Sequence, residues 1–159
     1  MKAIVCEEPF NFAFKEAERP IPGPEEALIR IRRIGICGTD LHAYRGEQPF
    51  FTYPRILGHE LSGTIEQIGA NPHGLKSGDA VIVVPYVACG RCGACRKGKT
   101  NCCEKMNVVG VHSDGGMREY IIHPVSLLIK ADRIGHEQAV LVECFGIGAH
   151  AVRRSGLTS

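Results

Sequence analysis

Four cysteines that lie close together place the strongest constraint on how this chain folds. Cys89, Cys92, Cys95 and Cys103 follow the pattern C-x2-C-x2-C-x7-C. Small or flexible residues separate the first three, so the backbone can curl and bring the sulfurs to about 2.3 Å from one ion. Four thiolates suit a closed tetrahedral zinc site with a structural role. The sequence therefore predicts a zinc-binding lobe around residues 86–107.

Other chemistries for this cluster are less well supported by its spacing. The C-x2-C-x2-C run is also found in ferredoxins, but the next cysteine comes too late for their C-x3-C spacing and no proline follows it. A redox pair is a further alternative. Cys102 adjoins Cys103, and since neighbouring side chains diverge, only one of the two can join the other three on one ion. The spacing alone leaves that choice open.

A second set of metal-ligating residue types is dispersed along the chain: Cys37, His59, Glu60 and Glu143. A mixed thiolate, imidazole and carboxylate set suits a zinc ion with one position left open for chemistry. Taken alone, Cys37 is more simply read as a buried free thiol and His59 as a hydrogen-bonded core histidine. The hypothesis of a catalytic zinc therefore depends on these residues meeting in the fold.

Asp40 is a candidate supporting residue for this second site. Its carboxylate is placed to accept the other N–H of a metal-bound imidazole, a bond that most ligating histidines make. The alternative is that Asp40 is the N-cap of a short helix over Leu41–Tyr44.

The rest of the chain is typical of short strands separated by glycine and proline. An alternating or apolar pattern predicts strands at 2–6, 12–15, 27–36, 61–68, 80–84, 119–122 and 127–129, the one at 80–84 buried on both faces. Helical patterning is weak until residues 136–153, where one or two helices are expected. Many short strands with little helix indicate a mainly β fold, a compact barrel or sandwich.

Bulk composition excludes several classes of function. The chain has 159 residues and a net charge of +2 with acids and bases interspersed, which suits one domain and argues against a nucleic-acid or membrane surface. Its first residues reach acid too soon for a secretory signal, and no apolar run approaches the length of a membrane span. The eight cysteines should then stay reduced. We therefore expect a cytoplasmic protein.

Three stretches together resemble the zinc-dependent alcohol dehydrogenases of the medium-chain family. They are Gly35-Ile36-Cys37-Gly38-Thr39-Asp40-Leu41-His42, Gly58-His59-Glu60-Leu61-Ser62-Gly63, and the four-cysteine lobe. Within that family the segments 48–55 and 109–117, together with Glu143, are similar to the polyol and sugar-acid branch, which includes sorbitol, threonine and L-galactonate dehydrogenases. The resemblance implies a GroES-like fold, a partly open β-barrel that carries both metals.

The resemblance also implies how the two zinc ions are bound. Cys37 and His59 would bind the catalytic zinc, with Glu60 as a ligand or an exchanging partner. Glu143 would bind that zinc or hold its water, although the sequence departs from the branch at Cys144, where proline usually follows the acid. The fourth ligand of the structural zinc would be Cys103. Alcohol dehydrogenases are themselves a standard example of an open zinc site, so this assignment is not independent of the resemblance.

The activity implied is the oxidation of a secondary hydroxyl of a polyol or sugar acid, by hydride transfer from a zinc-bound alkoxide to NAD(P). Zinc brings the pKa of bound water to about 7, and a coordinated hydroxyl should respond in kind. Thr39 would accept the hydroxyl proton and His42 would pass it to solvent. A small polyol or sugar acid is thus the expected substrate.

A nucleotide site is the missing part of this chemistry. The segment 146–151 fits G-x-G-x-x-A, but the fingerprint needs a preceding strand, and an acid about 20 residues further on. By resemblance this segment belongs to a linking helix. We therefore expect a GroES-like catalytic domain over 1–142 and a linking helix over 143–159 that leads to a Rossmann domain outside this chain. The chain alone would be inactive, and the longer protein would be a homodimer or homotetramer.

Two other classes of function remain as alternatives. One is a free-standing, zinc-stabilised GroES-like binding module without catalysis, which would not need the dispersed set to converge. The other is a zinc-ribbon nucleic-acid module, disfavoured by the near-neutral charge and by the lack of two separated C-x2-C pairs.

Overall fold

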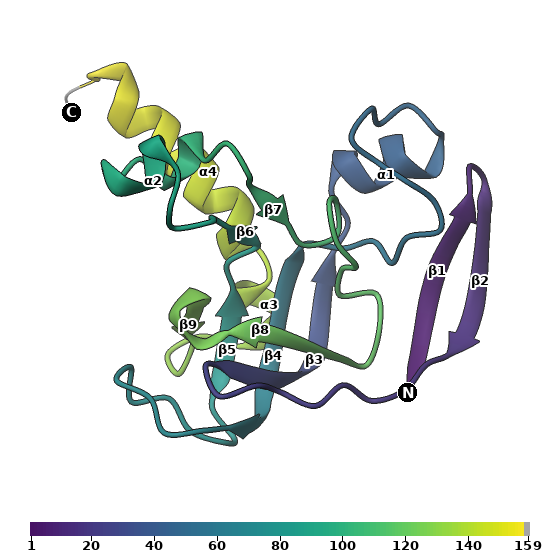
Figure 1. The fold of residues 1–159 in the computed structure, drawn as a ribbon, viewed down its shortest axis with the longest axis horizontal. Coiled ribbons are helices and arrows are strands. Elements are labelled where there is room, and N and C mark those ends of the chain that lie inside the picture. Colours follow the sequence, from purple (N-terminus) through teal and green to yellow (C-terminus); the bar gives the residue numbers. More distant parts are fainter. Residues whose placement is uncertain (158–159) are drawn as a thin grey trace.

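A computed structural model describes residues 1–157 of the chain. Its centre is an antiparallel five-stranded sheet in the order β8-β3-β4-β5-β9 (Figure 1). The strands are β3 (Glu26–Gly35), β4 (Glu60–Ile68), β5 (Ala80–Val83), β8 (Tyr120–Pro124) and β9 (Leu128–Lys130). Within residues 1–157 the edge strands β8 and β9 do not pair with each other, so the sheet curls without closing. The prediction of a mainly β, partly open fold is confirmed.

Two smaller sheets flank this centre. The hairpin of β1 (Lys2–Glu8) and β2 (Asn11–Glu16) lies at one side of the molecule and is joined to the body by single bridges at Ala3 and Cys6 (Figure 1). At the opposite side, β6 (Tyr86–Val87) pairs with β7 (Asn107–Val108). This short pair forms the neck of the cysteine-rich lobe, which holds α2 (Gly93–Arg96) and η1 (Thr100–Cys102). The lobe is therefore closed at its base by its own strands.

The core is apolar and lies on one face of the central sheet. It contains fully buried residues of β3, β4, β5 and β8, among them Ile29, Leu61, Ile65, Val81, Val83 and Ile121. On the other face, Ile82 packs with Ala131 and Ala139. Strand β5 is thus buried on both sides, as its unbroken apolar run predicts. Each such side chain contributes roughly 1.5–3 kcal/mol by leaving water.

Four helical segments complete the described chain besides those of the lobe. They are α1 (Gly38–Tyr44), η2 (Val125–Leu127), α3 (His136–Ala139) and α4 (Val142–Ser155). The expected helical region is therefore two helices, and the segment 146–151 lies inside α4 and not in a loop between strand and helix. Residues 158–159 of that predicted segment lie outside the described residues.

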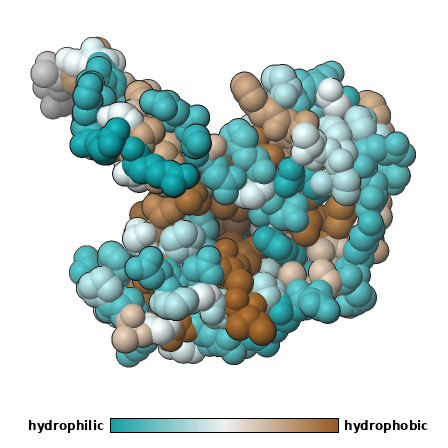
Figure 2. Space-filling model, in the orientation of Figure 1, coloured by the Kyte–Doolittle hydropathy of each residue, from teal (hydrophilic) through white to brown (hydrophobic). Residues whose placement is uncertain are grey.

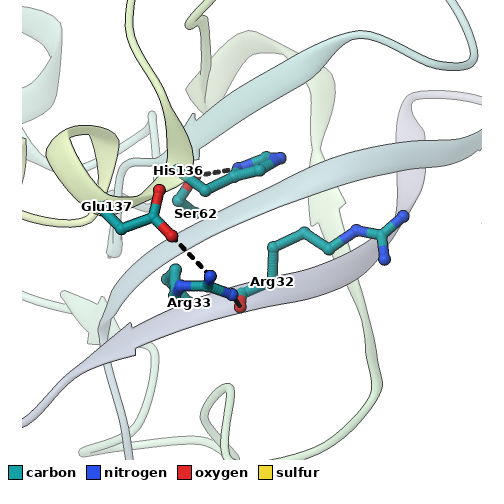
Figure 3. Close-up of polar contacts among 5 residues, drawn as sticks. All are labelled: Arg32, Arg33, Ser62, His136 and Glu137. Carbon is teal, nitrogen blue, oxygen red and sulfur yellow. Dashed lines mark hydrogen bonds and ion pairs between the residues drawn. The ribbon is translucent and has the colours of Figure 1, made fainter.

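Polar contacts attach α3 to the outer face of the sheet (Figure 3). His136 Nδ1 lies 2.7 Å from the buried Ser62 Oγ on β4, and Arg33 of β3 donates to Glu137 Oε1 at 2.5 Å. The methyl of Ala139 is fully buried beside them. Since α4 follows α3 after two residues, these contacts also determine where α4 begins.

We expect His136 to make stability depend on pH. Burial, and then the charge of Arg32, lower the pKa of this imidazole below its ordinary value. Because the pKa is lower in the folded chain, the unfolded chain binds the proton more tightly. The contribution of His136 to stability is therefore complete above the pKa of the unfolded chain and is lost as pH falls through that pKa. His136→Gln should therefore reduce the fall in unfolding free energy between about pH 7 and pH 5, measured by urea denaturation.

The parent chain loaded with zinc is the control. Burial also lowers the pKa of His123, so the unfolding free energy of the variant still falls in part with pH. If the unfolding free energy falls equally steeply with pH in the parent and the variant, the pKa of His136 is the same in the folded and the unfolded chain.

Candidate metal centres

The lobe brings together the sulfurs of Cys89, Cys92, Cys95 and Cys103, whose Sγ atoms all lie within 4.8 Å of one another. All are free thiols. Four sulfurs this close cannot all become thiolates without a counter-charge, and a divalent cation supplies it. The donor set therefore fits a tetrahedral zinc ion.

Backbone N–H groups prepare the lobe for thiolate charge. The N–H of Cys89 donates to Cys103 Sγ at 3.2 Å, and that of Cys95 donates to Cys92 Sγ at 3.5 Å. Bonds from the backbone of Cys95 and Glu104 lower the pKa of Cys92 to about 6, whereas burial raises the pKa of Cys95 to about 12. Hydrogen bonds to a thiolate favour it, so the backbone of the loop favours the thiolate form of Cys92.

Cys102 lies outside this group. Its side chain is exposed and its Sγ accepts a bond from the Asn101 amide at 3.5 Å. The structure thus places Cys103, and not Cys102, with the other three thiols.

The dispersed set is gathered only in part. Ligand atoms of Cys37, His59 and Glu60 lie within 4.8 Å of one another, and the two latter residues are only 6% and 7% exposed. Among the described residues, the buried His59 Nδ1 has no hydrogen-bond partner. A buried polar atom without a partner is costly, and an ion at this place is one way to satisfy the imidazole. Thiolate, imidazole and carboxylate together fit an open zinc site.

Local structure explains how these three side chains meet. Cys37 follows β3 and is the N-cap of α1, while His59 directly precedes β4 and Glu60 begins it. The strands pair with Gly35 opposite Glu60. A Cβ on Gly35 would lie 2.0 Å from Glu60 Oε2, so the lack of a side chain there leaves room for the carboxylate.

Asp40 has a different role from the expected one. Its Oδ2 accepts the N–H of Cys37 at 2.9 Å and its Oδ1 accepts that of Gly58 at 3.0 Å, so the structure shows no bond to an imidazole N–H in the described chain. It is also not the N-cap, a position that Cys37 takes. Asp40 is 3% exposed and joins the two segments that carry Cys37 and His59. It therefore holds ligands through their backbone.

The two predicted proton-transfer residues lie on α1. Thr39 Oγ1 is 3.7 Å from Cys37 Sγ, so this hydroxyl borders the metal-ligand group. His42 is exposed one turn further along the helix. The roles of Thr39 and His42 in proton transfer stay a prediction.

Glu143 lies outside the group of three among the residues that the structure describes. It stands in the first turn of α4, where its Oε1 accepts a hydrogen bond from the hydroxyl of Tyr86 at 2.5 Å. Burial, followed by the charges of Glu143, Cys37 and Glu60, raises the pKa of Tyr86. The phenol therefore stays neutral and donates. Sequence reasoning missed Tyr86, because its partner is 57 positions away and no motif marks it.

A groove of about 830 Å³ opens beside this pair. Tyr86 and Glu143 line it together with apolar side chains of β5, the lobe and α4, such as Val83, Val108 and Ile147. Figure 2 shows hydrophobic residues in the hollow between the arm that carries α2 and α4 and the strands below it. The volume is of the size that takes small-molecule ligands.

Fold and donor sets together define a GroES-like zinc-binding domain, and comparison with known proteins agrees. Residues 23–133 match the alcohol dehydrogenase GroES-like domain, so the chain belongs to this family. The predicted membership of the zinc-dependent alcohol dehydrogenases is thereby confirmed.

Individual relatives point to the polyol and sugar-acid branch. The chain is 53% identical to the L-galactonate-5-dehydrogenase of Escherichia coli strain K12, over 99% of this chain and 46% of that protein. A crystal structure of galactitol-1-phosphate dehydrogenase from Escherichia coli superposes with a TM-score of 0.87 at 32% identity, over 95% and 44%. The crystal structure of the alcohol dehydrogenase RspB from E. coli CFT073, complexed with NADH, superposes with a TM-score of 0.85 at 39% identity. The match covers 94% of this chain and 44% of that one. The chain thus spans less than half of each of these proteins.

Removing a lobe ligand should destabilise the chain far more than removing the adjacent thiol. We expect Cys89→Ser to lose one zinc per chain and to lower the thermal unfolding midpoint by roughly 10 °C or more, since structural zinc supplies folding free energy. Cys102→Ser is the matched control and should keep both the metal and the midpoint. Metal analysis and calorimetry measure the two effects. Equal midpoints for the two variants would contradict a structural zinc in the lobe.

A methyl group at Gly35 should damage the dispersed site selectively. Gly35→Ala would push against Glu60, whereas a Cβ at Gly38 meets nothing within 4 Å, so Gly38→Ala is the control. We expect a 10–100-fold weaker zinc affinity at this site for Gly35→Ala. Competition with a chelator while the lobe stays loaded gives the affinity. An unchanged value would mean that Glu60 is not a ligand.

Proposed function

We propose that this chain is the metal-binding catalytic part of a zinc-dependent NAD(P) dehydrogenase that oxidises a secondary hydroxyl of a polyol or sugar acid. The observation that carries the proposal is the convergence of the ligand atoms of Cys37, His59 and Glu60. A ligand-sized groove lined by Tyr86 and Glu143 supports it. The printed activities of the relatives, on L-galactonate and galactitol-1-phosphate, support the substrate class.

Two zinc ions per chain are part of the proposal. The four lobe cysteines would hold a structural ion, and Cys37, His59 and Glu60 would hold the catalytic one. Bound there, zinc supplies Lewis acidity, which lowers the pKa of a coordinated hydroxyl and polarises a carbonyl in the reverse direction. The protein's own contribution is a rigid donor set with one position open.

Proton transfer is assigned to α1. Thr39 Oγ1 borders the ligand group, so it accepts the proton of the substrate hydroxyl while it releases its own hydroxyl proton to the next group. His42 lies three residues further on, on the same helical face, and is exposed, so it passes the proton to solvent.

NAD(P) would be bound by a Rossmann domain beyond residues 143–159, with 1–142 as the catalytic domain. Support comes from the NADH found in the RspB structure and from the chain's matching less than half of its relatives. A homodimer or homotetramer and a cytoplasmic location remain predictions. Within residues 1–157, none of the helices has the length and apolar character needed to cross a membrane.

Loss of Cys37 should remove catalysis while the fold persists. In purified chain we expect Cys37→Ser to bind one zinc where the parent binds two, with an unchanged far-UV spectrum. In a protein that carries this chain with a nucleotide-binding domain, kcat/KM for polyol oxidation should fall by about 100-fold or more, as a catalytic metal ligand is lost. A panel of polyols and sugar acids with NAD+ or NADP+ tests this.

A parent protein that binds both zinc ions but oxidises no member of the panel would favour the non-catalytic binding module. Turnover by residues 1–159 alone would contradict the assignment of the nucleotide site to a separate domain.

A further inference from the structure

Tyr86 joins the groove to the dispersed metal site. It begins β6, directly after the buried Pro85, and its hydroxyl donates to Glu143 Oε1 at 2.5 Å. The ring exposes 39% of its surface and lines the groove. Cys37 and Glu60 are near enough for their charges to act on the phenol. One side chain therefore lines the groove and bonds to Glu143, within reach of the charges of the ligand group.

Glu143 depends on such a contact for its orientation. It lies on α4, a helix without a buried residue and without a side-chain cap at its start. Within residues 1–157, the bond from Tyr86 is the one hydrogen bond that its carboxylate makes. A flexible glutamate loses rotamer entropy when it is ordered, and a short bond to an ionised carboxylate is strong enough to offset that loss.

A free carboxylate near zinc would itself be a ligand, since Asp and Glu oxygens bind zinc at about 2.0–2.2 Å. Coordination by Glu143 in addition to Cys37, His59 and Glu60 would fill the position that a substrate hydroxyl needs. In the structure Glu143 is outside that group and is bonded to Tyr86. The phenol thus stands where it restrains the carboxylate.

We propose that Tyr86 is a positioning residue, which holds the Glu143 carboxylate at the edge of the groove and keeps it off the metal. The proposal rests on the proposed function, because it assumes an ion at Cys37, His59 and Glu60. It goes beyond that function in assigning to Tyr86 the control of whether the fourth metal position is open to substrate.

Cobalt(II) in the dispersed site, with zinc in the lobe, provides a test that does not require turnover. The energies and intensities of the cobalt d–d bands change when a carboxylate replaces the group at the fourth position, and the Cys37→Ser chain supplies the baseline. We expect Glu143→Gln to keep the parent spectrum, since Glu143 is not a ligand. Tyr86→Phe should shift the bands, and the double variant should restore the parent spectrum.

Tyr120→Phe is the matched control, because this tyrosine stacks on Arg19 through its ring and not through its hydroxyl. It should leave the cobalt spectrum as in the parent. In the active protein, Tyr86→Phe should raise KM more than it lowers kcat. The double variant should have a KM between those of Tyr86→Phe and the parent.

Four results would overturn the proposal. A parent-like spectrum for Tyr86→Phe would leave the phenol only a packing role, and a shifted spectrum that persists in the double variant would mean that Glu143 is not the intruding ligand. A spectrum that Glu143→Gln changes as strongly as Cys37→Ser does would make Glu143 a ligand already, with the proposed function intact. Absence of any cobalt signal at this site in the parent would overturn the proposed function as well.

Discussion

The pairing of β3 with β4 is the interaction on which the rest of the structure depends. In its register Ile34 lies opposite Leu61 and Gly35 opposite Glu60. Leu61 is buried in the core, and a slip of one residue would turn it to the other face of the sheet. The apolar core therefore sets the register, and the register carries Glu60 to the empty space over Gly35. The metal-ligand group is in this sense a product of hydrophobic burial.

The two metal centres are assembled by different physical routes. The lobe is local in sequence: its four thiols lie between the neck strands β6 and β7, and backbone N–H groups of the same loop already point at the sulfurs. The dispersed site needs the folded sheet and the capping of α1, with Asp40 as the connection between its two segments. Gathering a thiol, an imidazole and a carboxylate in a buried place costs solvation free energy, which the core offsets. A metal ion bound among the three side chains would offset part of this lost solvation free energy.

α4 is attached to the body mainly at its beginning. The polar contacts of α3 with Arg33 and Ser62 anchor the preceding turn (Figure 3). Tyr86 holds Glu143 in the first turn of α4. Beyond that turn the helix leaves apolar side chains such as Phe145 and Val152 exposed. Glu143, which lines the groove, is therefore held by the first turn of α4 and by its bond to Tyr86. Anchoring at one end is what allows a long, exposed helix to present a carboxylate at a defined place.

The sequence by itself determined the parts whose physics is local. Cysteine spacing predicted a four-thiol lobe with Cys89, Cys92 and Cys95, and the family resemblance chose Cys103 as its fourth thiol. Apolar alternation predicted the strands other than β6 and β7, and the glycine-flanked motifs around Cys37 and His59 predicted two residues of the dispersed group. Tertiary structure alone decided that Glu60 joins them while Glu143 does not, that Asp40 bonds to backbone, and that Tyr86 partners Glu143. These outcomes depend on the register of a sheet and on the docking of α3. Neither is encoded in spacing, because both are determined by which faces of distant segments become buried together.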